Sequence, residues 1–211
     1  MTWIKRILIA LLLILTVSAA LLWTSDTDRD AMIAKYGGEK TNWATTQDGQ
    51  FIHFRDQGSM DGPAVILIHG SNSSLHTWEN WVEHLSAKYR VITLDLPGHG
   101  LSGAHPDHDY SANAMTEAVD AVVRMLKLEK FILGGNSMGG WVAWRYALKF
   151  PQKLNAIILV DAAGADLPAT AKSDLPIGFR IIQTPGINQL AAKLTPRFLI
   201  KRSLEQSISV S

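Results

Sequence analysis

The chain of 211 residues contains no cysteine, so disulfide bonds, thiolate nucleophiles and cysteine metal sites are excluded. It also lacks an excess of charge of either sign, because the formal net charge is +1 and charged residues make up only 18%. Basic and acidic residues are mixed along the chain, which leaves no basic footprint for a nucleic-acid partner. Hydrophobic residues make up 47%, so we expect a globular domain with a substantial core.

The longest apolar run lies at the N-terminus. Lys5 and Arg6 precede a run from Ile7 to Trp23, after which polar residues return. At 1.5 Å per residue this run spans roughly 25 Å, slightly less than a hydrocarbon core of about 30 Å. It is apolar on all sides, which favours a membrane-spanning helix over the alternative of a buried core helix.

Residues 1–25 are therefore interpreted as a membrane anchor or as a cleaved signal peptide. Val17-Ser18-Ala19 is a candidate cleavage site, but Leu21-Leu22-Trp23 continue the apolar run beyond it, which favours the anchor. The basic pair is expected to stay in the cytoplasm while the rest crosses. The protein is then anchored in a membrane of the bacterial inner-membrane type, or secreted or periplasmic after cleavage, with its globular part outside the cytoplasm.

The rest of the chain is divided by its patterns into a connector (26–40, helical near 31–36), a core (41–162) and a final region (163–211). Strands and helices alternate through the core, which predicts βαβ units and a mostly parallel sheet flanked by helices. The expected strands are 43–46 and 51–55, which form a hairpin, then 64–69, 91–94, 131–133 and 156–160. The expected helices are 78–85, 112–126 and 139–150. After Asp161, prolines divide the sequence into short segments at 177–182, 187–194 and 198–204, typical of the start of a helical lid.

A candidate nucleophile follows the strand at 131–133. Gly135-Asn136-Ser137-Met138-Gly139 matches G-x-S-x-G, with a strand directly before it and a helix directly after. Such a turn holds the serine oxygen above the sheet in strained geometry, and small neighbours allow it. Ser137 is the predicted nucleophile, although an ordinary glycine-rich turn would show the same letters.

An oxyanion hole needs two backbone N–H donors. Met138 is the predicted first donor, and Ser71, after the strand at 64–69, is the predicted second, with Asn72 as the alternative. His69 and His99 are interpreted as residues that shape the loops. Asp95 is expected to cap backbone N–H groups.

Together these motifs resemble the α/β-hydrolase family, over roughly residues 41–162: HGSNSS at 69–74, DLPGHG at 95–100 and GNSMGG at 135–140. The closest similarity is to bacterial esterases and lipases of the monoacylglycerol-lipase type. The resemblance implies acyl transfer through Ser137, with Met138 and Ser71 in the oxyanion hole. It implies no metal or organic cofactor, and a small-molecule or lipid ester as substrate.

The resemblance also predicts parts that these 211 residues lack. The triad of this fold runs serine, acid, histidine along the chain, yet all seven histidines precede Ser137. Asp161 is a candidate acid, with a structural role as the alternative. The last two core strands are also missing, so 157–160 is expected to form an apolar sheet edge. We therefore expect a truncated, frameshifted or degenerate chain of nearly no activity.

Three functions stay open from the sequence. The first is hydrolysis of carboxylic esters or lipids through an acyl-enzyme on Ser137. The second is hydrolysis of carbon–carbon bonds in ring-fission products, because the GNSMGG elbow is similar to that of such hydrolases. The third is a non-catalytic, membrane-tethered binding protein, which the missing histidine would permit.

Overall fold

A computed structural model describes residues 2–25, 27–164 and 193–194. The first helix, α1 (Thr2–Leu22), belongs to a different unit from the sheet and is described by itself. Its stretch Trp3–Leu22 has a mean hydropathy of 2.2 and is fully exposed, so it is a candidate membrane span or signal sequence. The helix has 21 residues, or about 30 Å, and matches a hydrocarbon core better than the run from Ile7 alone.

The structure contains the expected helix near 31–36 and the expected hairpin. Helix α2 (Arg29–Tyr36) begins where the carboxylate of Asp28 accepts a hydrogen bond of 2.8 Å from the backbone N–H of Ala31. Strands β1 (Asn42–Thr45) and β2 (Phe51–Gly58) form an antiparallel hairpin. Strand β2 is longer than expected because its second half pairs with another strand of the sheet.

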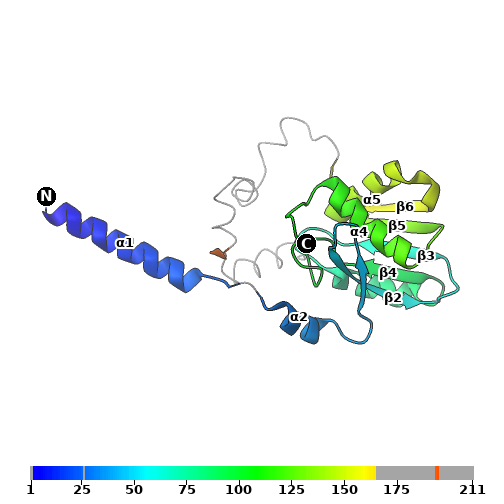
Figure 1. Cartoon of the computed structure of the whole chain (residues 1–211), viewed down its shortest axis with the longest axis horizontal. Coiled ribbons are helices and arrows are strands. Elements are labelled where there is room, and N and C mark those ends of the chain that lie inside the picture. Colours follow the sequence, from blue (N-terminus) through cyan, green and yellow to red (C-terminus); the bar gives the residue numbers. More distant parts are fainter. Residues whose placement is uncertain (1, 26, 165–192, 195–211) are drawn as a thin grey trace, which may run out of the picture. The chain divides into compact units, whose positions relative to one another are not determined.

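Six strands form one sheet in the order β1-β2-β4-β3-β5-β6 (Figure 1). The pairs β3–β4, β3–β5 and β5–β6 are parallel, which confirms the predicted βαβ units. The pairs β1–β2 and β2–β4 are antiparallel, so the sheet is mixed. The remaining elements are β3 (Ala64–Ile68), η1 (Leu75–Trp78), α3 (Glu79–Leu85), β4 (Arg90–Leu94), α4 (Ala112–Met125), β5 (Phe131–Asn136), α5 (Met138–Lys149), η2 (Pro151–Lys153) and β6 (Leu154–Val160).

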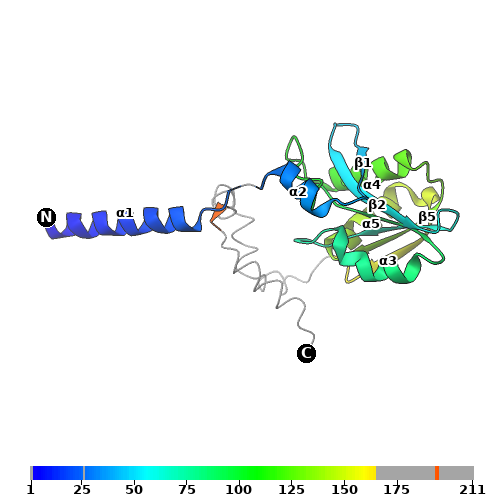
Figure 2. The same cartoon turned by 90° about the horizontal axis from the view of Figure 1, so that it is seen from below.

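Helices cover both faces of the sheet. Figure 2 shows α3 on the side opposite α4. One core joins α4 and α5 to the sheet through residues such as Val119, Val142 and Leu133. A smaller core joins η1 and α3 to the other face through Trp78 and Val82. Burial of these apolar side chains on both faces is the main stabilising term of the fold.

One part of the expected helix 78–85 is wrong. Its first residue, Trp78, ends the 3₁₀ turn η1, and α3 begins only at Glu79. Trp81 is 40% exposed, and its ring packs edge-on against that of Trp78, with the ring centroids 5.2 Å apart.

Strand β6 is the edge strand of the sheet in the described part of the chain. Its side chains Ile157 and Leu159 are 39% and 48% exposed, as the expected apolar edge requires. The segments 177–182 and 198–204, and 187–194 apart from its last two residues, lie outside the described residues.

Candidate functional site

The carboxyl ends of β3, β4 and β5 lie at the same edge of the sheet, and Ser137 lies there between β5 and α5. Its backbone has φ 50° and ψ −113°, a conformation that a non-glycine residue rarely adopts and that costs about 1–3 kcal/mol. Two hydrogen bonds hold it: the N–H of Ser137 donates to Val160 O, and the N–H of Ala163 donates to Ser137 O, both at 2.9 Å. The surrounding structure therefore stabilises a strained serine at the end of a central strand.

Three glycines make room for this turn. A Cβ on Gly135 would lie 2.2 Å from the carbonyl oxygen of Gly139, and a Cβ on Gly139 would lie 2.3 Å from the carbonyl oxygen of Ile68. A Cβ on Gly70 would lie 3.3 Å from the Cβ of Ser137. The first turn of α5 therefore lies directly on β5 and β3, and the loop after β3 lies against the serine.

The two predicted oxyanion donors lie on either side of this contact. Met138 is the first residue of α5, and the first N–H groups of a helix have no partner within it. Ser71 belongs to the loop that touches Ser137, and its hydroxyl lies 3.4 Å from the sulfur of Met138. Asn72, the alternative donor, has a positive φ of 53°. The contact between Ser71 and Met138 brings these two residues together next to Ser137, and their role as oxyanion donors stays a prediction.

His69 fixes the position of this loop. Its Nδ1 lies 2.7 Å from Gly70 O, which can only accept, and its Nε2 accepts the N–H of Leu96 at 3.1 Å. These partners require the neutral ring with its proton on Nδ1. Burial lowers the pKa of His69 from 6.5 to about 4, so the ring is neutral at pH 7. His99 packs against it with ring centroids 5.1 Å apart, and both histidines therefore shape loops, as expected.

Asp95, at the end of β4, holds three segments together. Its carboxylate accepts the backbone N–H groups of Leu75 at 2.8 Å and Leu101 at 2.9 Å, which confirms the expected capping role. It also lies 2.8 Å from Nδ1 of His53 in β2. Burial opposes ionisation of Asp95, but these hydrogen bonds outweigh it and hold its pKa below 3.8.

The partnership with His53 was not expected from the sequence. A histidine in the middle of a strand carries no signal of its partner, which lies 42 positions away. The alternation of β2 would place His53 on the face of the exposed Phe51, opposite Ile52 and Phe54, yet its ring is fully buried. A buried histidine needs a polar partner, but the strand pattern gave no sign that this one is buried.

No histidine in the described part of the chain is hydrogen-bonded to Ser137. Both ring nitrogens of His69, and Nδ1 of His99, are engaged with backbone groups. Asp161 follows β6 at the same sheet edge and has a φ of 49°. Within residues 2–25, 27–164 and 193–194, no group of three or more potential ligands could hold a metal ion. The described site thus contains the predicted nucleophile and the predicted N–H donors, and no described histidine is hydrogen-bonded to Ser137.

Comparisons with known proteins agree with this geometry. Residues 63–194 match the family model described as alpha/beta hydrolase fold. An uncharacterized protein of Mycobacterium tuberculosis is 37% identical over 132 residues, covering 63% of this chain and 36% of that protein. The 2-hydroxymuconate semialdehyde hydrolase of a Pseudomonas species is 30% identical over 130 residues, covering 60% and 45%. A thermophilic esterase from Thermogutta terrifontis superposes with a TM-score of 0.58 at 31% identity, covering 69% and 54%.

The chain spans less than half the length of these curated relatives, 36% of one and 45% of the other. Neither they nor the family model single out the monoacylglycerol-lipase branch. The matched residues nevertheless include the loop at Ser71 and the elbow at Ser137.

Proposed function

The chain belongs to the alpha/beta hydrolase fold family, and from this premise we propose that it supplies the nucleophile of a serine hydrolase that cleaves carboxylic esters or lipids. The observation that supports this most is the strained backbone of Ser137, held at φ 50° between a central strand and a helix. Strain of this kind persists where the surroundings enforce it, and it exposes the serine oxygen at the carboxyl edge of the sheet.

In the proposed mechanism, Ser137 Oγ attacks the ester carbonyl and forms an acyl-enzyme, which water then hydrolyses. The N–H groups of Met138 and Ser71 stabilise the oxyanion, and the positive end of the α5 dipole adds to this. The hydroxyl proton needs a base, and no histidine follows Ser137 in the 211 residues. We therefore propose that this polypeptide by itself is nearly inactive.

A kinetic experiment with added base tests this proposal. The purified chain in maltoside micelles is expected to hydrolyse p-nitrophenyl acetate at a rate no more than about 10³–10⁴-fold above that of the reaction in water. This is the acceleration that remains when an oxyanion hole and substrate binding act without a triad. Free imidazole should raise the difference between the wild-type chain and Ser137→Ala at least about tenfold, because a positioned base contributes about 10²–10⁴-fold. Equal rates for the two chains at every imidazole concentration would refute Ser137 as nucleophile. Rapid turnover without imidazole would refute the missing base.

Carbon–carbon bond hydrolysis is the second candidate. It is favoured by one observation, the 30% identity to a 2-hydroxymuconate semialdehyde hydrolase. A ring-fission substrate, tested at the same imidazole concentrations as the ester, separates the two candidate functions. The substrate with the faster Ser137-dependent hydrolysis identifies the reaction class. Failure of both would favour a non-catalytic, membrane-tethered binding protein.

We further propose that α1 anchors the globular part to a membrane, with Lys5 and Arg6 on the cytoplasmic side. In bacterial cells the full chain is expected to stay in the membrane pellet after extraction at alkaline pH, whereas a chain without residues 1–25 should be soluble. If cells that express the full chain release a shortened product into the soluble fraction, residues 1–25 would instead contain a cleaved signal peptide. The division into 26–40, 41–162 and 163–211 also stays a proposal.

A further inference from the structure

A hollow of about 380 Å³ lies beside α3, on the outer side of β2. This volume falls in the range of cavities that hold small ligands, about 300–1,000 Å³. Three separate segments form its wall: the chain just before β1, strand β2 and one face of helix α3. The lining residues are Lys40, Arg55, Gln57, Glu79, Val82, Glu83 and Ser86.

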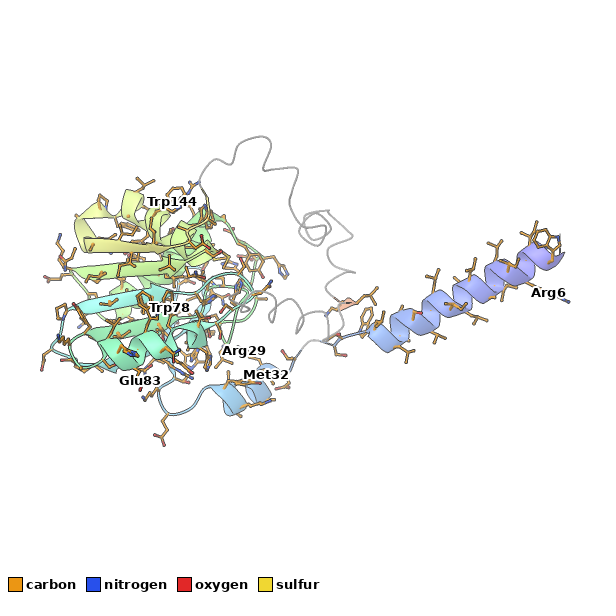
Figure 3. All side chains as sticks on the ribbon, turned by 180° about the vertical axis from the view of Figure 1, so that it is seen from behind. Arg6, Arg29, Met32, Trp78, Glu83 and Trp144 are labelled. Atoms are coloured by element: carbon orange, nitrogen blue, oxygen red, sulfur yellow. The ribbon has the colours of Figure 1, made fainter. Side chains whose placement is uncertain are left out.

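The hollow contains charges of both signs. Arg55 and Glu79 form an ion pair at 3.5 Å. Lys40 and Glu83 are both exposed, and neither side chain forms an ion pair with any described residue. Glu83 is labelled on α3 in Figure 3. One cation and one anion of the lining are therefore available to a ligand.

Arg55, which lines this wall, also carries a buried donor without a partner. Its Nη2 lies 3.1 Å from both the Tyr36 carbonyl oxygen and the Nε2 of His76. Its Nε is buried and donates to no acceptor in the described structure. An unsatisfied donor of a charged group is costly, and such groups commonly mark the position of an unseen partner.

We propose that this hollow binds a small zwitterion that carries an ammonium group and a phosphate or carboxylate group a few atoms apart. The anionic group contacts Lys40 and Arg55, and the ammonium group contacts Glu83. A simple anion would be repelled by Glu79 and Glu83, and a simple cation by Lys40. Gln57 and Ser86 supply neutral hydrogen-bonding groups. Binding here does not depend on the chemistry of Ser137.

The test is calorimetric titration of the full chain in maltoside micelles with O-phosphorylethanolamine. Saturable binding is expected, and it should be tighter than that of inorganic phosphate or ethanolamine alone. Lys40→Met and Glu83→Gln should each weaken it about fivefold, the effect of one exposed charge pair. Lys130→Met and Glu129→Gln remove the same charges from the exposed stretch before β5 and should leave binding unchanged.

A second arm identifies the source of the zwitterion. Phosphatidylethanolamine, added to the micelles at the same mole fraction as phosphatidylglycerol in a parallel sample, presents the ammonium group and the phosphate, here as a diester, in a lipid headgroup. Tighter binding of the lipid than of the soluble compound assigns the hollow to a headgroup, and the reverse assigns it to a free metabolite. The proposal is overturned if neither binds, if inorganic phosphate binds equally well, or if Lys40→Met and Glu83→Gln bind like their controls.

Discussion

Gly135→Ala is expected to destabilise the fold by about 3 kcal/mol. It should also lower the rate of ester hydrolysis by the chain to the rate of the Ser137→Ala variant. The added Cβ would lie 2.2 Å from Gly139 O and 2.6 Å from the backbone N of Gly140. These are backbone atoms of the first turn of α5, so no side chain can rotate away. The start of the helix must then shift, and with it the serine and the N–H of Met138.

The matched control is Gly103→Ala. Gly103 has φ 69°, and a Cβ there would meet no atom within 4 Å. Its cost is therefore limited to backbone strain, about 1 kcal/mol. Urea unfolding of both variants, followed by tryptophan fluorescence, compares the two costs. A Gly135→Ala chain as stable as the Gly103→Ala chain would show that α5 does not lie on β5 at this point.

The free energy of unfolding is expected to fall by about 3 kcal/mol between pH 6.5 and pH 4 through His69 alone. The folded chain keeps this ring neutral down to about pH 4, because burial disfavours its charged form. The unfolded chain binds a proton near pH 6.5, so across this window it holds more protons than the folded chain. Stability is therefore complete above pH 6.5 and is lost as the pH falls.

His69→Gln isolates this contribution, since glutamine offers one donor and one acceptor but does not titrate. Between pH 6.5 and pH 4, the loss in free energy of unfolding should be about 3 kcal/mol smaller in the variant than in the wild-type chain. NMR titration of the wild-type imidazole gives a second readout, with an expected midpoint near pH 4. A midpoint near 6.5 would mean that the ring is exposed and does not hold the loop between Gly70 and Leu96.

Local sequence patterns were sufficient for most of the sheet. The continuous apolar run at Ala64–Ile68 is fully buried in β3, and the prediction needed no tertiary information. The end of β5 was placed at Leu133, whereas the strand continues to Asn136. Gly134 and Gly135 suggested a turn, yet they are small because Leu67 and the first turn of α5 pack directly on them. A close approach between elements cannot be read from one strand alone.

In the candidate site too, features set by local sequence were predicted and features set by contacts between distant segments were not. Ser137 and Met138 were found because the elbow is local, with strand, turn and helix adjacent in sequence. Ser71 was inferred from its place after a strand; it does contact Met138, while its role as a donor stays a prediction. The buried pair of His53 and Asp95 was missed because its two members meet only through the pairing of β2 with β4.

The central claim is that Ser137 is a nucleophile beside an oxyanion hole. It is tested most directly by incubating the full chain with a fluorophosphonate and imidazole and locating the adduct by mass spectrometry. The account predicts one adduct per chain, on Ser137, with none on the exposed Ser111 and none in Ser137→Ala. An adduct distribution that is the same in the wild-type chain and in Ser137→Ala would contradict it.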